Sequence, residues 1–388
     1  MILGVDASNI RGGGGVTHLV ELFRAADPVA FGFSQVVVWS GQETLSRVED
    51  RPWLAKSHQS LLDKSLPYRM FWQRFRLSDL ARMADCDLLF VPGGSYAGDF
   101  GPIVTMSRNM LPFEWSELRR FGWSLITLRL LLLRLTMSRT FRKAGGVIYL
   151  TQYARDTVLK VTGAQRGRSV IIPHGISPRF FLPLRPQRSA MEFNDTQPCR
   201  VLYVSIIDLY KHQWQVAEAV AHLRLAGVPL VLDLVGPPGA GINRLIDTLH
   251  RIDPLATFIR YRGAVPYDEL HDIYKAADIG VFASSCENMP NILLEGMAAG
   301  LPMACSRKDP MPEILGDAGA YFDPENPDDI ARALRKLIHC PGLRTRMVES
   351  SVERAQAFHW RRCASETFRF LAEVASTPSA SSSTSGRT

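Results

Sequence analysis

Residues 279–300 read IGVFASSCENMPNILLEGMAAG, and this stretch decides the fold. Its first five residues, Ile279–Ala283, form an apolar run that predicts a buried strand. Glu287 follows in a turn, and Pro290 then begins a predicted helix of small and apolar residues that carries Glu295. Open α/β sheets bind ligands in the crevice beyond the carboxyl ends of their strands, and both carboxylates fall there.

Short apolar runs alternate with helical patterns, such as Trp214–Ala226 and Asp268–Ala277, along most of the chain. The runs form two series that predict parallel strands. The first series comprises Ile2–Asp6, Val36–Trp39, Leu88–Val91, Ile103–Met106, Val147–Leu150 and Val170–Ile172. The second comprises Val201–Ser205, Leu230–Val235, Phe258–Arg262, Ile279–Ala283, Pro302–Ala304 and Ala320–Phe322. Two successive βαβ series predict an α/β protein with two doubly wound sheets.

The predicted domain order follows from these series. We expect a first domain over 1–175, a polar, Pro-rich linker over 176–199 and a second domain over 200–350. A C-terminal helix over 351–376 is expected to return to the first domain. The tail 377–388 is rich in Ser and Thr, has no large apolar side chain and is expected to be disordered.

Composition limits the class of protein. The 388 residues carry a net charge of +7, which fits a nucleic acid, an anionic membrane surface or phosphorylated substrates. The six cysteines are scattered without a Cys-x-x-Cys pair, which argues against a metal or disulfide framework and favours a reducing compartment. The N-terminus reads as a strand and not as a signal peptide, so a cytoplasmic location is expected. No RNA-binding module is recognisable, and we predict no nucleic-acid partner.

A run of four glycines, Gly12–Gly15, lies between the first predicted strand and a helix. Glycine lets the backbone approach a ligand closely, and the N–H groups at a helix start attract anions. Neither register of the run matches the Gly-x-Gly-x-x-Gly fingerprint, and the second strand does not end in an acidic residue. NAD binding is therefore disfavoured, while an unstructured glycine loop remains the alternative.

Two other motifs carry weaker signals. Lys211 follows the strand Val201–Ser205 and directly precedes a helix, where it could offer a point charge to a phosphate; an ordinary surface lysine is the alternative. Asp85 and Asp87 match an Asp-x-Asp metal motif, but they directly precede the strand Leu88–Val91 and fit a turn better. We predict no metal.

The glycine run, Lys211 and the Glu287–Glu295 pair, in this order, resemble the GT-B glycosyltransferases, specifically the retaining family 4 (glycosyltransferase group 1). The stretches at residues 172–176, 300–304, 312–319 and 321–324 are also similar to this family. The motif YKHQ at 210–213 resembles a subgroup that builds bacterial surface polysaccharides. The resemblance implies two Rossmann-like domains facing across a cleft.

The resemblance also implies an activity: transfer of a hexose, with mannose as first guess, from a GDP- or UDP-sugar to a lipid-linked or polysaccharide acceptor. No cofactor is implied. Glu287 and Lys211 would be catalytic, with Lys211 neutralising the diphosphate, Glu287 near the sugar and Glu295 on the ribose. The implied donor-binding residues are Gly14, Gly15, Lys211, Val265, Asn288, Met289, Pro290, Asn291 and Glu295.

The acceptor is expected at Arg108 and Asn109, in a segment where many relatives carry a histidine. The chain also departs from the family at Ile206, where many relatives have an arginine that would contact the diphosphate. Two alternatives stay open: a nucleotide-sugar epimerase of the same fold, and a non-catalytic subunit of a polysaccharide-assembly complex.

The segment Trp115–Lys143 combines seven basic residues with two tryptophans and a leucine-rich stretch. Such a pattern favours peripheral contact with an anionic membrane, here the inner face of the plasma membrane. A core helix with snorkelling arginines is the alternative.

Overall fold

The computed structural model describes residues 1–377, and the chain in it divides into two compact units. Unit 1 contains Met1–Phe113, Leu125–Gly175 and the chain from His359 onward. Unit 2 contains Glu114–Ser124 and Ile176–Phe358. The predicted linker 176–199 therefore clusters with unit 2. Of the tail predicted to be disordered, 378–388 lies outside the described residues.

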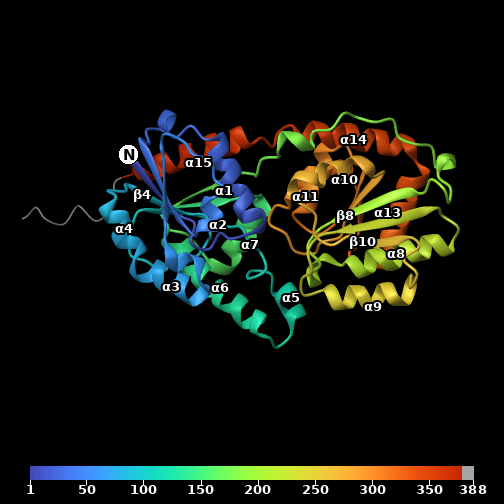
Figure 1. The fold of residues 1–388 in the computed structure, drawn as a ribbon, viewed down its shortest axis with the longest axis horizontal. Helices are drawn as coiled ribbons and strands as arrows, with labels where there is room; N and C mark the ends of the chain where they lie inside the picture. Colours follow the sequence, from blue (N-terminus) through green and yellow to red (C-terminus); the bar gives the residue numbers. More distant parts are fainter. Residues whose placement is uncertain (378–388) are drawn as a thin grey trace, which may run out of the picture. The chain divides into compact units, whose positions relative to one another are not determined.

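Unit 1 is built on a parallel sheet in the order β3-β2-β1-β4-β5-β6-β7, with helices on both faces (Figure 1). Its strands are β1 (Ile2–Asp6), β2 (Gln35–Ser40), β3 (Leu54–His58), β4 (Leu88–Val91), β5 (Ile103–Met106), β6 (Gly146–Tyr149) and β7 (Arg168–Ile171). Its helices are α1 (Gly13–Ala25), α2 (Gln42–Leu45), α3 (Leu66–Phe75), α4 (Leu77–Met83), α6 (Leu125–Lys143), α7 (Gln152–Thr162) and α15 (Trp360–Ala375), with short 3-10 turns η1 (Val29–Phe31) and η2 (Ser60–Asp63).

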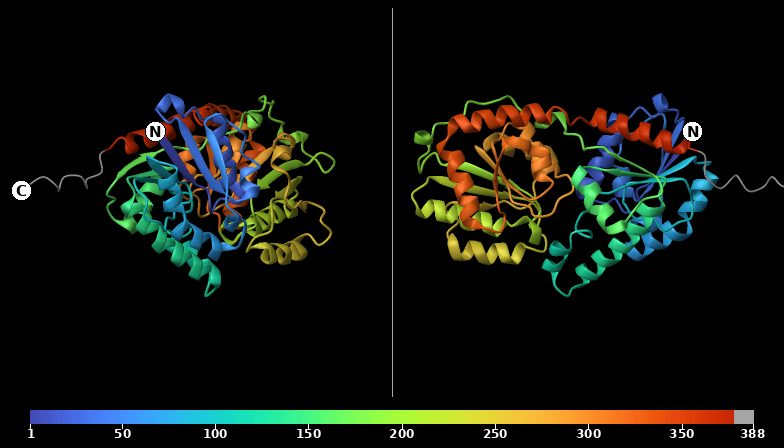
Figure 2. Two further views of the ribbon diagram at one scale, coloured as in Figure 1. Left: turned by 60° about the vertical axis from the view of Figure 1, so that its left-hand side comes forward. Right: turned by 180° about the vertical axis from the view of Figure 1, so that it is seen from behind.

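The last helix of the chain, α15, completes the core of unit 1. It packs along α1 and against β4 and β6. Figure 2 shows this red helix among the blue elements of the N-terminal part of the chain. Its buried residues include Phe368, whose ring meets Phe33 edge-on at 6.1 Å. The chain segment from His359 thus supplies part of a hydrophobic core that residues 1–175 build.

Unit 2 contains the second parallel sheet, in the order β10-β9-β8-β11-β12-β13. Its strands are β8 (Cys199–Val204), β9 (Leu230–Val235), β10 (Ile259–Tyr261), β11 (Ile279–Phe282), β12 (Met303–Ser306) and β13 (Gly319–Phe322). Its α-helices are α5 (Trp115–Leu118), α8 (Gln213–Leu225), α9 (Ile242–Ile252), α10 (Leu270–Ala276), α11 (Asn291–Ala298), α12 (Met311–Leu315), α13 (Pro327–His339) and α14 (Pro341–Ala355). The 3-10 turns are η3 (Arg119–Phe121), η4 (Pro178–Phe180), η5 (Ala190–Glu192), η6 (Leu209–Lys211), η7 (Tyr267–Glu269) and η8 (Gly316–Ala318).

The predicted strands are present within one or two residues of their expected ends, and one strand was missed. Strand β3, with the sequence LAKSH, is mixed in polarity and only partly buried, because it lies at the edge of the sheet. It therefore lacks the continuous apolar run that identified the central strands. The predicted helix at 351–376 is in fact the end of α14 followed by α15, with the break at residues 356–359.

The segment Trp115–Lys143 is not the single helix that its composition suggested. Gly122 has φ of +57° and separates α5 and η3 from α6. This left-handed conformation suits glycine, which has no Cβ to clash. Residues 114–124 cluster with unit 2, whereas α6 belongs to unit 1.

Among residues 1–377, the structure contains no helix that is both long and apolar enough to span a membrane.

Candidate donor-binding site

Lys211 and Glu287 form a buried ion pair in unit 2. The Lys211 Nζ contacts Glu287 Oε1, and the two side chains are only 6% and 13% exposed. The ammonium group also lies over the rings of Tyr210 and Phe282, at 5.0 and 5.2 Å from their centroids. A buried ion pair is stable only when its charges compensate each other, and here each side chain supplies the counter-charge of the other.

The sheet brings these two residues together. Strands β8 and β11 are parallel neighbours, with Val201 opposite Ile279, so the loops after them emerge at the same edge. Lys211 ends η6 after β8, and Glu287 lies in the turn after β11. The Tyr203 hydroxyl donates to the Lys211 carbonyl oxygen at 2.6 Å, which fixes the backbone at the lysine.

Glu295 lies on α11 and is only 4% exposed. Its carboxyl accepts hydrogen bonds from the hydroxyls of Tyr267 and Tyr274, both at 3.2 Å. Burial raises the pKa of Glu295 to about 8, and the two hydroxyls oppose this shift. Near neutral pH the carboxyl is therefore mostly protonated, and it can both donate and accept a hydrogen bond.

The turn before α11 contains the remaining expected donor residues of this motif. Asn288, Met289 and Pro290 are buried, and Asn291 is the first residue of the helix. The helix thus starts one residue later than predicted, with Pro290 as its N-cap. Val265 is half-buried in the loop between β10 and η7, also in unit 2.

The glycine run belongs to unit 1 and is not a loop ahead of the helix. Helix α1 begins at Gly13, so Gly14 and Gly15 lie in its first turn, where N–H groups have no partner within the helix. Arg108 donates to the Gly14 carbonyl oxygen at 2.6 Å and to that of Gly15 at 3.4 Å. Burial lowers the pKa of Arg108 to about 10.

The structure therefore groups the expected residues in two sets. Lys211, Glu287 and the residues around α11 lie at one edge of the unit 2 sheet. In unit 1, Arg108 braces the glycine turn, whereas the Asn109 Oδ1 accepts from the Leu111 N–H at 3.1 Å and shapes a local turn.

The Asp-x-Asp motif in unit 1 forms a turn. Asp85 has φ of +49°, and the Asp87 carboxylate accepts from the Ile2 N–H at 2.6 Å. Within residues 1–377 no group of three or more His, Cys, Asp or Glu side chains could hold a metal ion.

Sequence reasoning missed several residues of this site. Tyr267 and Tyr274 contact Glu295, and the signal for Tyr274 was a tyrosine on the buried face of a predicted helix, because a buried hydroxyl needs a partner. Glu117 was missed for a different reason. It contacts Ser285, next to the Glu287 turn, from 168 residues away along the chain, and no local pattern indicates this.

Residues 186–354 match the family model described as "Glycosyl transferases group 1". A D-inositol 3-phosphate glycosyltransferase of Streptomyces bingchenggensis is 27% identical over 60% of this chain and 53% of its own. The O-antigen chain mannosyltransferase B of Escherichia coli is 33% identical over 28% of this chain and 29% of its own. The chain thus spans about half, or less, of the length of these curated relatives.

Solved structures resemble nearly the whole chain. A sucrose-phosphate synthase of Thermosynechococcus elongatus aligns with a TM-score of 0.74 at 16% identity, covering 96% of this chain and 99% of its own. Anabaena HepE, in complex with UDP and glucose, aligns with a TM-score of 0.68 at 15% identity, covering 96% and 100%. These structures share two Rossmann-like parallel-sheet domains with the present chain, which therefore has the GT-B fold, and residues 186–354 of the chain resemble the group 1 glycosyl transferases.

Proposed function

We propose that this protein is a retaining glycosyltransferase that takes a hexose from a nucleotide-diphosphate sugar. The observation that carries the proposal is that the Lys211–Glu287 ion pair and the buried Glu295 carboxyl lie beyond the carboxyl ends of the strands of the unit 2 sheet, where open α/β sheets bind ligands. The family match over residues 186–354 covers this edge of the sheet from Lys211 to Glu295. HepE, which has the same fold, was solved with UDP and glucose, and this supports a nucleotide-sugar donor.

In this proposal the donor diphosphate takes over Lys211 as its counter-ion. A phosphate oxygen near Nζ replaces the Glu287 carboxylate, which is then free to accept a hydrogen bond from a sugar hydroxyl. Glu295, mostly protonated, is suited to the two neighbouring ribose hydroxyls because it can donate to one and accept from the other. Positioning and charge stabilisation supply the rate enhancement.

The transfer step requires no reactant other than the donor and the acceptor. The acceptor hydroxyl oxygen forms a bond to the anomeric carbon on the face from which the diphosphate departs, so the configuration is retained. The bond between that carbon and the phosphate oxygen breaks, and the hydroxyl proton passes to the departing phosphate. Lys211 compensates the charge that develops on this leaving group.

We propose mannose as the sugar and a surface-polysaccharide intermediate as the acceptor. The O-antigen mannosyltransferase relative supports this choice, although its similarity covers 28% of this chain. Another relative is named a D-inositol 3-phosphate glycosyltransferase, and inositol phosphate is anionic. We therefore expect an acceptor that carries phosphate, as lipid-linked sugars do.

A basic cluster in unit 1 supports a phosphate-bearing acceptor. Arg11, from the loop after β1, donates to the Lys64 carbonyl oxygen at 3.3 Å, and Arg69, from α3, donates to that of Ser8 at 3.5 Å. Burial lowers the pKa of Arg69, and the nearby charges of Arg11 and Arg129 lower it further. Like charges held together in this way favour an anion between them. The cluster lies near the first strand. It adds basic groups to Arg108 and Asn109, the residues that the sequence assigned to the acceptor.

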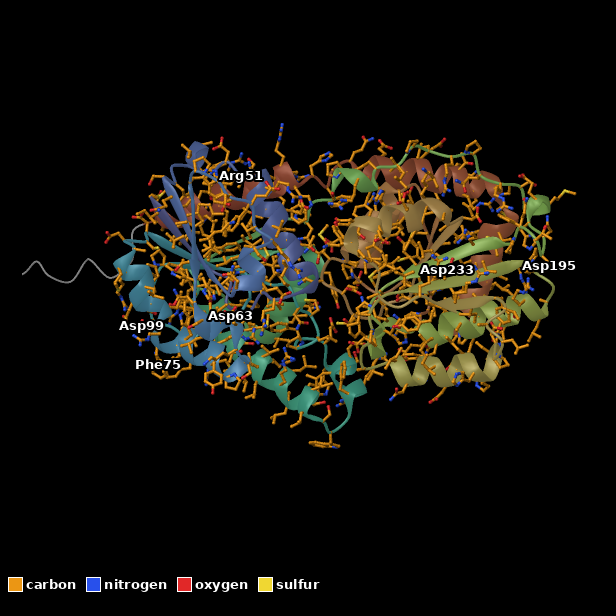
Figure 3. The ribbon with its side chains drawn as sticks, in the orientation of Figure 1. Arg51, Asp63, Phe75, Asp99, Asp195 and Asp233 are labelled. Atoms are coloured by element: carbon orange, nitrogen blue, oxygen red, sulfur yellow. The ribbon has the colours of Figure 1, made fainter. Side chains whose placement is uncertain are left out.

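An exposed apolar surface on unit 1 supports peripheral membrane contact. Helix α6 exposes Leu125, Ile126, Leu128, Leu132 and Leu135, and α3 exposes Leu66, Tyr68, Met70, Phe71 and Phe75. Both helices lie on the same side of unit 1, and Phe75 projects from the end of α3 with 58% of its surface exposed (Figures 1 and 3). Arg74, Arg76, Arg129 and Arg139 on or next to these helices are exposed as well. Apolar and basic side chains together suit an anionic lipid surface.

The test is a calorimetric screen of UDP, GDP and their sugars, followed by an assay for nucleotide release with acceptor present. We expect micromolar binding of one nucleotide diphosphate and transfer from its sugar. Binding without release from any common donor would favour a non-catalytic subunit. Interconversion of the donor sugar without transfer would favour the epimerase.

A further inference from the structure

The short segment Glu114–Ser124 leaves unit 1 after Phe113, clusters with unit 2 and returns to unit 1 at Leu125. Its 3-10 turn η3, which packs against α5, lies against η6, the turn that ends in Lys211. The first part of the chain thus contributes a piece of structure directly beside the donor site. What it contributes chemically is a carboxylate.

Glu117 of this segment is 5% exposed and forms the centre of a hydrogen-bond network. Its Oε2 accepts from the Ser285 hydroxyl at 2.7 Å and from the Arg120 Nε at 2.7 Å. Arg120 also donates to Glu117 Oε1 at 3.2 Å and binds both oxygens of Glu325, at 2.6 and 3.1 Å. The arginine supplies the counter-charge that a buried carboxylate requires.

Ser285 connects this network to the loop that contains Tyr210, Lys211 and His212. Its hydroxyl also lies 2.9 Å from His212 Nε2, and its N–H donates to the Tyr210 carbonyl oxygen at 2.8 Å. The single hydroxyl proton goes to Glu117, because a carboxylate only accepts, so His212 Nε2 carries a proton and donates to Ser285. Burial lowers the pKa of His212 to about 4, so the ring is neutral and this tautomer is the donor that the network needs.

The two residues that this network fixes are neighbours of the proposed catalytic pair. His212 directly follows Lys211, has φ of +53° and is fully buried. Ser285 lies two residues before Glu287. Loss of the Glu117 carboxylate would leave the Ser285 hydroxyl only the longer hydrogen bond to the Tyr210 carbonyl oxygen, at 3.3 Å, in a region where buried polar groups need well-placed partners.

We propose that Glu117 is a positioning residue for the donor site, and that it fixes the positions of Lys211 and Glu287 through its contacts with Ser285 and, beyond it, His212. This inference rests on the proposed transferase function for its kinetic consequence, but the structural part stands without it. Glu117 does not touch the reacting atoms in this account. It acts by restricting the turn 284–290 and the turn that ends in Lys211.

The experiment uses the full chain with Glu117→Ala and Ser285→Ala, and with Ser285→Thr as the variant that keeps the hydroxyl. Glu218→Ala is the matched control, since Glu218 forms an ion pair with Arg251 at 2.6 Å elsewhere in unit 2. Amide hydrogen exchange of residues 284–290 and steady-state kinetics with the nucleotide-sugar are both measured. Exchange is informative here because it reports local opening independently of turnover.

We expect exchange in 284–290 to become at least about fivefold faster in Glu117→Ala and Ser285→Ala, with kcat lowered about tenfold or more. Ser285→Thr should restore most of both properties, and the Glu218 variant should change neither. Unchanged exchange in 284–290 would overturn the proposal whether or not the protein is active. Faster exchange with unchanged kcat would reduce Glu117 to a structural anchor.

If the wild-type protein transfers no sugar from any donor, the proposed function fails, and the exchange result still decides whether Glu117 holds this turn. If Glu117→Ala does not fold, Ser285→Ala compared with Ser285→Thr decides the question, because both of these changes keep the ion pair between Glu117 and Arg120.

Discussion

At the scale of single residues, the Lys211–Glu287 pair is expected to contribute both to the stability of the fold and to ligand binding. Lys211→Ala leaves the Glu287 carboxylate buried without a counter-charge, and removing one partner of a buried ion pair costs about 3–5 kcal/mol. We therefore expect a clear drop in the thermal midpoint. We also expect the nucleotide diphosphate to bind at least about tenfold more weakly, which corresponds to about 1.4 kcal/mol.

The double variant Lys211→Met, Glu287→Gln separates these two effects. It removes both charges together, so it should recover much of the lost stability and none of the nucleotide affinity. Thermal unfolding and calorimetry measure the two quantities. Nucleotide affinity equal to that of the wild type in either variant would contradict the phosphate role of Lys211.

Glu295 makes the stability of the protein depend on pH. Its pKa is raised by burial from an ordinary 4.5 to about 8, so the folded state binds the proton more tightly than the unfolded state does. The contribution of this proton binding to the free energy of unfolding is complete below about pH 4.5. It is lost as the pH rises toward 8, with a slope of at most about 1.4 kcal/mol per pH unit.

Glu295→Gln should remove this slope. The free energy of unfolding, measured with denaturant at several pH values between these limits, should decline less steeply in the variant than in the wild type. Parallel curves for the two proteins would show that Glu295 is ionised in the fold, and the expected donation to a ribose hydroxyl would then be wrong.

At the scale of elements, the exposed face of α6 provides a test of membrane contact. Leu128→Glu with Leu132→Glu places two negative charges on that face without changing a buried residue. We expect co-sedimentation with vesicles of phosphatidylcholine and phosphatidylglycerol to be lost. Leu225→Glu, on α8 of unit 2, is the control because Leu225 is also exposed. Equal sedimentation of all the proteins would exclude α6 as the contact surface.

The elements also show what could be predicted from sequence and what could not. The central strands and the strand–turn–helix around Glu287 were predictable, because buried parallel strands are continuous apolar runs bounded by turns. Edge strand β3 was not, since its side chains are only partly buried. The break at Gly122 was missed because a basic, leucine-rich composition does not show where a helix packs against one unit or another.

At the scale of the whole molecule, the two units are expected to divide the substrates between them. Arg69→Ala in unit 1 should raise the KM for a phosphate-bearing acceptor by about tenfold and leave nucleotide binding unchanged. Arg74→Ala removes the same charge from an exposed position of the same helix and should have little effect. Equal effects of the two variants would point to general charge attraction and against a specific site.

The long-range part of the site lay beyond sequence reasoning. Lys211 and Glu287 could be assigned to one edge of a sheet, because each follows a strand of the same series. The contact between Glu117 and Ser285 could not, since it depends on a segment of the first half of the chain clustering with unit 2. Pairwise contacts of this kind are set by tertiary packing, and no local spacing encodes them.

The most direct test of the central claim is a paired measurement on Glu287→Gln: the rate of sugar transfer and the dissociation constant of the nucleotide diphosphate. We predict that transfer falls by about a hundredfold or more while the nucleotide binds within about threefold of the wild type, because in the proposed mechanism Glu287 contacts the sugar and Lys211 the diphosphate. Transfer near the wild-type rate would contradict the assignment of Glu287 and, with it, the proposed site.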